Sequence, residues 1–375
     1  MDFIVIMLSQ LLFTQSPEWV YQYVHASYTD EWPAAITIDN IGNTYTTGVI
    51  CSDDTTGGHL TGIGIIKLNA SGQERWIYFN DTLGRLNHGY DIAYKNKLYV
   101  TGYAEYFYPV HKFHHITLCL DTAGSVQWLC RDTINQGRGA AIALDSAGGV
   151  YAVGMCYGQA TDIGVIKYDT LGNECWRYVY DGPASSYDDP SVIVSDRWDN
   201  VYIGGYSTGD TTSSDFTIIK LDSAGNEKWV YRYDGPIHAR DEITALAVDT
   251  FGNVYAGGSS GGDGWDFCVV SVDSGGHERW VYRLDGLAPS SDDFANDLAI
   301  DCAGYIYVCG ASKDDTIGLF TVVKLDTTGQ EMWRYKSSGP SGYNGGSALR
   351  IALVADSVIY AAGTFRNTAG RGQIV

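Results

Sequence analysis

One short pattern, a tyrosine followed three residues later by a glycine (Tyr-x-x-Gly), recurs along this chain at an almost constant interval. It occurs seven times, with successive tyrosines 51 to 54 residues apart, at Tyr45, Tyr99, Tyr151, Tyr202, Tyr255, Tyr307 and Tyr360. Seven such periods account for nearly all of the 375 residues. A repeat of about fifty residues indicates a modular array, in which each unit buries its apolar surface against the next.

A second pattern, Asp-x-x-Gly-x-x-x-Trp, lies at a fixed place in the repeat. Its tryptophans are Trp128, Trp176, Trp229, Trp280 and Trp333, and Trp76 ends a variant that begins with asparagine. The aspartate can start a turn by bonding its own backbone, and the glycine can take the left-handed conformation that closes a hairpin. We expect the tryptophans, with Trp19 as a seventh, to pack between or along the repeats.

A third pattern, Asp-x-x-Gly-Asn-x-Tyr, is complete at residues 39–45 and 249–255 and indicates a second hairpin in each repeat. Alternating apolar and polar residues around both turns predict four strands per repeat, for example at residues 244–249, 254–258, 267–273 and 279–285. One such sheet cannot cover both of its faces, whereas a ring of sheets covers each face with the next. The sequence therefore predicts an all-β protein, a seven-bladed β-propeller of four-stranded antiparallel blades.

The two ends of the chain look like complementary parts of one blade. Residues 2–7 and the segment around Trp19 have the pattern of a third and a fourth strand, whereas the last segments, near Ile351 and Tyr360, have that of a first and a second strand. We therefore expect a single domain over residues 1–375, in which residues 1–24 pair with residues 347–375 and close the ring. The apolar start could instead be a leader, but no lysine or arginine precedes it.

Charge and apolar content exclude some classes of partner. The chain has 44 acidic and 24 basic residues, a net charge of -20, which would repel a phosphate backbone. No apolar stretch reaches the length of about eighteen residues that a membrane span needs. We expect neither a nucleic-acid partner nor a membrane span, and a monomer.

The repeat resembles a known family in three segments, residues 216–222, 229–236 and 246–255. They are similar to the bacterial β-propeller repeats called SBBP, and the similarity extends over nearly the whole chain. This resemblance implies an exported protein, extracellular or on the cell surface, without catalytic activity. Residues 325–333 also resemble the tryptophan-docking repeats of quinoproteins, but the chain has seven repeats rather than eight and no neighbouring cysteine pair, so this weaker similarity implies no quinone cofactor.

The second repeat contains the most unusual loop. Tyr103, Tyr106 and Tyr108 precede His111 and His114 there. Aromatic faces beside polar groups suit the stacking of sugars, and a group of histidines suits a metal ion. We therefore predict a ligand site at these five residues; the alternative is an insertion that packs on a neighbouring loop with its histidines in water.

Aspartates recur where each repeat should return to the ring axis, at Asp30, Asp188, Asp241 and Asp293. Carboxylates brought together from several blades repel one another unless a cation neutralises them, and oxygen donors suit calcium. We therefore predict a calcium site at the mouth of the channel. The alternative is that each aspartate only ends its own crossing and points to solvent.

The chain contains no nucleophile elbow, HExxH motif, phosphate-binding loop or dinucleotide-binding fingerprint. These observations favour a non-catalytic scaffold that binds a protein or a carbohydrate through its variable loop face. The alternative function is that of a lyase or hydrolase with a cation at the channel mouth, because several blades together can assemble a catalytic site that no local motif reveals.

Overall fold

Every regular element in the described part of the chain is a β-strand. A computed structural model describes residues 3–7, 19–23, 32–53, 59–84, 86–106, 111–133, 137–158, 160–262, 264–284, 292–314, 317–339, 342–354, 358–367 and 372–374. The chain forms two compact units, Met1–Val179 and Tyr180–Val375.

The first unit contains a two-stranded sheet and three four-stranded sheets, all built from antiparallel neighbours. The two-stranded sheet is β1 (Phe3–Met7) with β2 (Trp19–Tyr23). Sheet 1 is β3 (Trp32–Ile38), β4 (Thr44–Asp53), β5 (His59–Leu68) and β6 (Glu74–Asn80). Sheet 2 is β7 (Leu86–Tyr94), β8 (Leu98–Tyr106), β9 (Lys112–Leu120) and β10 (Val126–Arg131), and sheet 3 is β11 (Gly137–Leu144), β12 (Val150–Tyr157), β13 (Thr161–Tyr168) and β14 (Glu174–Tyr180). One parallel bridge, between Thr61 and Leu86, links sheets 1 and 2.

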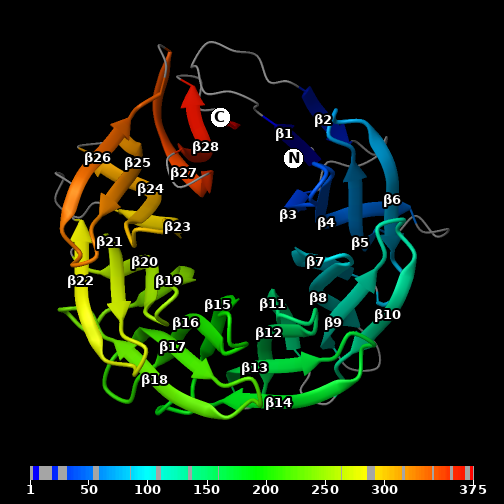
Figure 1. The fold of residues 1–375 in the computed structure, drawn as a ribbon, viewed down its shortest axis with the longest axis horizontal. Helices are drawn as coiled ribbons and strands as arrows, with labels where there is room; N and C mark the ends of the chain where they lie inside the picture. The colour runs from blue at the N-terminus through cyan, green and yellow to red at the C-terminus, as the bar shows by residue number, and fades with distance from the viewer. Residues whose placement is uncertain are drawn as a thin grey trace. The chain divides into compact units, whose positions relative to one another are not determined.

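The second unit contains three further four-stranded sheets and a three-stranded one (Figure 1). Sheet 4 is β15 (Asp188–Ser195), β16 (Val201–Thr208), β17 (Ser214–Leu221) and β18 (Glu227–Tyr233). Sheet 5 is β19 (Asp241–Val248), β20 (Val254–Gly261), β21 (Trp265–Val272) and β22 (Glu278–Leu284). Sheet 6 is β23 (Phe294–Ile300), β24 (Ile306–Asp314), β25 (Ile317–Leu325) and β26 (Glu331–Ser337), and sheet 7 is β27 (Tyr343–Val354), β28 (Val358–Asn367) and β29 (Gly372–Ile374).

The predicted turn chemistry is confirmed between the third and fourth strands of the sheets. In sheet 4, Asp222 Oδ1 accepts hydrogen bonds from the amides of Ala224 and Asn226, at 3.0 and 2.9 Å. Gly225 has a φ of 84° and donates its amide to the Asp222 carbonyl. The aspartate thus replaces the backbone partners that the turn lacks, and the glycine supplies a conformation that other residues avoid.

Each packed tryptophan lies on the corresponding turn of the next sheet. The indole of Trp229 donates to the Ser274 carbonyl at 3.1 Å, and a Cβ added to Gly276 would lie 2.7 Å from its ring. The same contact occurs for Trp76 on Gly124, Trp128 on Gly172 and Trp280 on Gly329. Trp333 is 39% exposed, since sheet 7 has no such turn among its described strands, and the side chain of Trp19 lies outside the described residues.

The glycine of the Tyr-x-x-Gly pattern faces a bulge in the first strand of the sheet. In sheet 5 the register of β19 against β20 shifts between Ile243 and Ala245, and a Cβ on Gly258 would lie 2.0 Å from the Glu242 carbonyl oxygen. Only glycine fits so close to a neighbouring backbone. The tyrosine three residues earlier, Tyr255, is buried and its hydroxyl reaches Asp249 at 3.2 Å.

The core of each unit lies between successive sheets. One cluster combines Tyr255, Phe267 and Val269 of sheet 5 with Leu298 and Val308 of sheet 6. Equivalent clusters join sheets 1 and 2, 2 and 3, 4 and 5, and 6 and 7. Within each unit successive sheets therefore bury a face against each other, as expected of a modular β array.

The prediction of an all-β fold built from four-stranded antiparallel sheets is confirmed. Strand boundaries differ slightly: β19 begins at Asp241, three residues before the predicted start, because the bulge allows pairing to continue beyond it. The predicted pairing of residues 1–24 with residues 347–375 does not occur among the strand pairs of the described residues, so ring closure stays a prediction. No helix in the described part of the chain could cross a membrane.

Candidate binding site

Most described residues of the predicted loop in the second repeat lie in or beside two paired strands, β8 and β9. Tyr103 and Tyr106 lie in β8, His114 lies in β9, and His111 immediately precedes β9; Tyr108 lies outside the described residues. Tyr103 and His114 are buried, whereas the side chain of His111 is 53% exposed. Tyr103 pairs with His115 and Ala104 pairs with His114, so Tyr103 and His114 point to opposite faces of sheet 2.

The face of sheet 2 that carries Tyr103 meets the first strand of sheet 3 in an aromatic cluster. The ring of His88 in β7 stacks on Tyr103, with centroids 4.8 Å apart and an angle of 11°. Phe113 approaches Tyr103 edge-on at 5.5 Å. The guanidinium of Arg138 in β11 lies over both rings, 4.9 Å from the Tyr103 centroid and 3.8 Å from that of Phe113.

Exposed aromatic rings extend this cluster towards solvent. Trp32 at the start of β3 is 48% exposed and its ring centroid lies 6.2 Å from that of His88. Tyr90 is 39% exposed, 5.7 Å from Tyr103, and Tyr157 is 36% exposed, 5.6 Å from Phe113. Flat apolar rings beside fixed polar groups form the kind of surface on which a sugar ring stacks. We call this set, with His88, Tyr103, Phe113 and Arg138, the aromatic surface.

Two buried nitrogens of the aromatic surface have no hydrogen-bond partner in the described part of the chain. Nδ1 of His88 and Nε of Arg138 accept or donate no hydrogen bond among the residues that the structure describes. Buried polar atoms are nearly always paired in native proteins, and leaving one unpaired costs about 1–3 kcal/mol. Glu105 instead pairs with His111 at the edge of the surface. The two nitrogens are therefore candidates for contact with a bound polar molecule.

Burial also fixes the charges of these groups. It lowers the pKa of His88 to about 4, and Arg138 lowers it further while Glu105 opposes the shift. Burial raises the pKa of Tyr103, and its neighbour Tyr90 adds to the rise. At neutral pH the surface thus presents a neutral imidazole, a protonated phenol and a fixed guanidinium cation.

Three members of the aromatic surface occupy the same register position in successive sheets. Trp32, His88 and Arg138 each lie in the first strand of their sheet, on the residue just before the bulge. Sequence reasoning missed all three. The glycine of Tyr-x-x-Gly could have located them, because each lies opposite the residue that follows that glycine.

The other face of sheet 2 carries a separate group that is packed on itself. His114 Nδ1 bonds the Asp132 carbonyl oxygen at 2.9 Å. Tyr106 meets the His114 ring edge-on at 5.2 Å, and Arg131 lies 4.2 Å over Tyr106. The structure therefore places predicted residues Tyr103 and His111 at the aromatic surface, and Tyr106 and His114 away from it.

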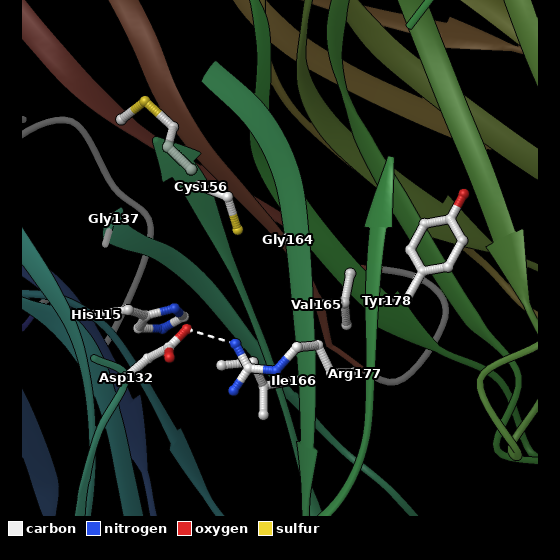
Figure 2. Close-up of a pocket in the computed structure, with 10 residues that line it drawn as sticks. His115, Asp132, Gly137, Cys156, Gly164, Val165, Ile166, Arg177 and Tyr178 are labelled. Carbon is white, nitrogen blue, oxygen red and sulfur yellow. Dashed lines mark hydrogen bonds and ion pairs between the residues drawn. The ribbon is translucent and has the colours of Figure 1, made fainter. Parts of the chain in front are cut away.

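A pocket between sheets 2 and 3 is lined by His115, Asp132, Cys156 and Arg177. Figure 2 shows Asp132 and Arg177 facing each other beside the His115 ring, with a separation of 2.8 Å between the paired atoms. His115 Nε2 lies 2.7 Å from the Thr101 hydroxyl, and burial lowers its pKa to about 4. The space between these side chains has no room for a water molecule. We interpret this group as a packed polar core between the sheets.

The predicted calcium residues are buried and bonded to nearby backbone. Asp188 Oδ2 accepts from the Gly182 amide at 2.6 Å, and Asp293 accepts from the Lys313 amide. Asp241 accepts from the amides of Gly235 and Gly261, at 2.8 and 3.2 Å. All three are fully buried, and burial raises the pKa of Asp188 and of Asp241.

Asp30 lies outside the described residues. The carboxylates that approach Asp241 belong to Asp215 and Asp234, a group that includes neither Asp188 nor Asp293. Neither neighbour was predicted as a ligand. Whether any of these aspartates binds calcium stays a prediction.

Comparison with known proteins supports the repeat assignment. A family model described as the SBBP β-propeller repeat matches residues 235–264, which confirms the resemblance there. No curated protein sequence matches the chain.

Solved structures share the fold at low sequence identity. Polysaccharide lyase Uly1 is 12% identical, with a TM-score of 0.56 over 100% of this chain and 96% of that one. The β-propeller domain of the Trilobed protease from Pyrococcus furiosus is 6% identical, with a TM-score of 0.52 over 92% of this chain and 94% of that one. At such identity these similarities show the β-propeller fold alone.

Proposed function

We propose that this β-propeller binds an acidic glycan at the aromatic surface, on the cell surface or outside the cell. The observation that carries the proposal is the arrangement of Arg138 and His88, each with a buried nitrogen that has no partner among the described residues, beside the exposed rings of Trp32, Tyr90 and Tyr157. The rings supply stacking area for sugar faces, and the guanidinium supplies a charged partner for a carboxylate. Binding alone needs only stacking and charge pairing, whereas catalysis would also need a base and an acid placed at the scissile bond.

The proposal is tested by the binding of polygalacturonate, an acidic polysaccharide, to the full chain, measured by calorimetry. Arg138→Met keeps the aliphatic stem and removes the charge, so we expect binding at least tenfold weaker. The matched control is Arg240→Met in the second unit, where a guanidinium also lies over a tyrosine, Tyr206, at 4.8 Å. Equal affinity of the two variants and the unchanged protein would contradict the proposal.

A second candidate function is that of a lyase acting on the same polymer. Its supporting observation is the combination of a neutral His88, an exposed Tyr90 and a fixed Arg138, together with the fold shared with polysaccharide lyase Uly1. Arg138 would neutralise the uronate carboxylate and His88 would take the proton from the adjacent carbon. Tyr90 would protonate the departing glycosidic oxygen, which leaves a double bond in the sugar.

The two functions differ in one product. A lyase releases an unsaturated uronate, whose double bond is followed by ultraviolet absorbance during incubation with polygalacturonate. An absorbance that increases with the unchanged protein but not with His88→Ala would show lyase activity. Binding of the polymer without any increase in absorbance would support the non-catalytic binding function.

The complete architecture that we propose is a seven-bladed ring, in which residues 1–24 complete the last blade. Seven copies of Tyr-x-x-Gly support the number. In this proposal β27 and β28 are the first two strands of the last blade and β1 and β2 are the other two, so that β1 takes the place beside β28 that the three residues of β29 have in the structure. A variant that begins at Ala34 would leave sheet edges uncovered, so we expect aggregation and a lower melting temperature. A monomer of unchanged stability would contradict closure by these residues.

A further inference from the structure

Three aspartates meet at the junction of sheets 4 and 5. Asp215 is the second residue of β17, Asp234 follows the end of β18, and Asp241 is the first residue of β19. One carboxylate oxygen from each lies within 4.8 Å of the others. Three separate strands therefore bring three acidic groups to one place.

The group is buried, and part of its bonding capacity is unused. Asp215 is 3% exposed and Asp241 is fully buried. Oδ1 of Asp215 and Oδ1 of Asp234 are both inaccessible to solvent, and neither accepts a hydrogen bond from the described residues. A carboxylate oxygen removed from water needs a donor or a cation, so these two atoms point to a missing partner.

The guanidinium of Arg232, the cation that the protein itself supplies to this group, bonds the other oxygen of Asp215. Arg232 Nη2 donates to Asp215 Oδ2 at 2.7 Å, and the Thr212 hydroxyl donates to the same oxygen at 2.9 Å. Oδ1 of Asp215 receives no hydrogen bond from the described residues. Three carboxylates and one guanidinium give a net charge of about -2 (-3 + 1) when all are ionised.

Asp241 is held in place by hydrogen bonds from the backbone. Its two carboxylate oxygens accept from the amides of Gly235 and Gly261, at 2.8 and 3.2 Å. On the outer side, the exposed imidazole of His238 contacts the other oxygen of Asp234. Three carboxylates thus meet with a single guanidinium, and a divalent ion would balance the remaining negative charge.

We propose that a calcium ion binds between Asp215, Asp234 and Asp241. The donors are all oxygens, which calcium prefers, and water would complete its coordination of about six to eight ligands. This site keeps Asp241 from the sequence prediction and replaces its partners by carboxylates of the same junction. It shares no residue with the aromatic surface, so it is independent of glycan binding.

The test is calorimetric titration of calcium chloride into the metal-free full chain. We expect saturable binding in the unchanged protein, with one equivalent lost or weakened at least tenfold in Asp234→Asn and in Asp215→Asn. Asp234 is partly exposed, so Asp234→Asn should fold even if the buried Asp215→Asn does not. Circular dichroism of the metal-free variants checks this.

The matched control is Asp273→Asn, which removes the same charge from an exposed turn of the same unit where asparagine also fits, as Asn69 shows in sheet 1. It should bind calcium as the unchanged protein does. Absence of calcium binding in the unchanged protein, or binding that Asp234→Asn leaves intact, would overturn the proposal.

Discussion

Sheets 2 and 4 share one framework but carry different chemistry at equivalent positions. In sheet 2 the residue before the bulge is His88, paired with Tyr103; in sheet 4 it is Asp189, paired with Tyr206. Both tyrosines also lie under an arginine, Arg138 in the first case and Arg240 in the second. Because the backbone register is the same, the difference lies in the side chains alone.

The tyrosine and the arginine have polar partners in the second case, whereas the arginine in the first case has none among the described residues. Tyr206 donates its hydroxyl to Asp189, and Arg240 pairs with Glu242 at 3.0 Å. Arg138, by contrast, forms no ion pair among the described residues, since its neighbours are His88 and aromatic rings. In sheet 4 the tyrosine is therefore bonded to Asp189 and the nearby arginine to Glu242, whereas Arg138 has no carboxylate partner among the described residues and can offer its charge to a ligand.

The largest effect should come from the framework that both regions share. Replacing Trp229 by alanine removes a half-buried ring and its bond to the Ser274 carbonyl. We expect a loss of about 2–4 kcal/mol in the free energy of unfolding, somewhat below that of a fully buried tryptophan, measured by denaturant titration. Tyr157→Ala is the control, since its exposed ring should cost less than about 1 kcal/mol. Similar losses in both variants would remove the distinction between framework and surface.

The next effect converts one region into the other. His88→Asp places beside Arg138 the carboxylate that sheet 4 has at the same register, so an internal ion pair should compete with the ligand. We expect binding of polygalacturonate to weaken about ten- to a hundredfold, or about 1.4–2.8 kcal/mol. His88→Asn, which adds no charge, should weaken it less. If the aspartate variant bound as tightly as the unchanged protein, the comparison would fail.

Acidification should change the stability of the two units differently. The pKa of His115 falls to about 4 from 6.5 on folding, because of its burial, although Asp132 opposes and Arg177 reinforces the shift. The unfolded chain then binds more protons between these values, so the first unit loses up to about 1.4 kcal/mol per pH unit as pH falls from 6.5 to 4. His115→Gln should reduce this slope, and the remainder should come from His88, whose pKa burial also lowers to about 4.

The strands around Asp188 and Asp241 in the second unit should respond with the opposite sign, unlike turn carboxyls such as Asp222, whose pKa hydrogen bonds from Asn226 lower. Burial raises the folded pKa of Asp188 and Asp241, so their ionisation costs stability above the folded pKa, and acidification relieves that cost. Hydrogen exchange of each unit, corrected for intrinsic rates, measures both trends. Parallel loss of protection in the two units would contradict this assignment of the buried groups.

The smallest effect should come from a turn position that already varies among the sheets. Asp121 accepts hydrogen bonds from the amides of Ala123 and Ser125, and Asn69 does the same for Ser71 and Gln73 in sheet 1. Asp121→Asn should therefore change the free energy of unfolding by less than about 0.5 kcal/mol. Asp121→Ala, which removes the acceptor, should cost about 1 kcal/mol, so equal costs would show that the side chain does not stabilise this turn.

The sequence alone determined the repeat, the strands and the turns of this protein. These features depend on groups a few residues apart, as when Asp222 bonds the amides of residues 224 and 226, so local chemistry suffices. The structure adds a bulge opposite the glycine of Tyr-x-x-Gly, where only glycine fits against the backbone carbonyl of the first strand.

Only the tertiary structure decided which side chains meet. Trp32, His88 and Arg138 come from three different sheets and are about fifty residues apart, so their proximity depends on how successive sheets pack. Tyr103 belongs to this group and His114 does not, because alternation along a strand sends adjacent cross-strand pairs to opposite faces. A list of residues in one loop cannot contain that difference, since it arises from the face that each strand presents to the next sheet.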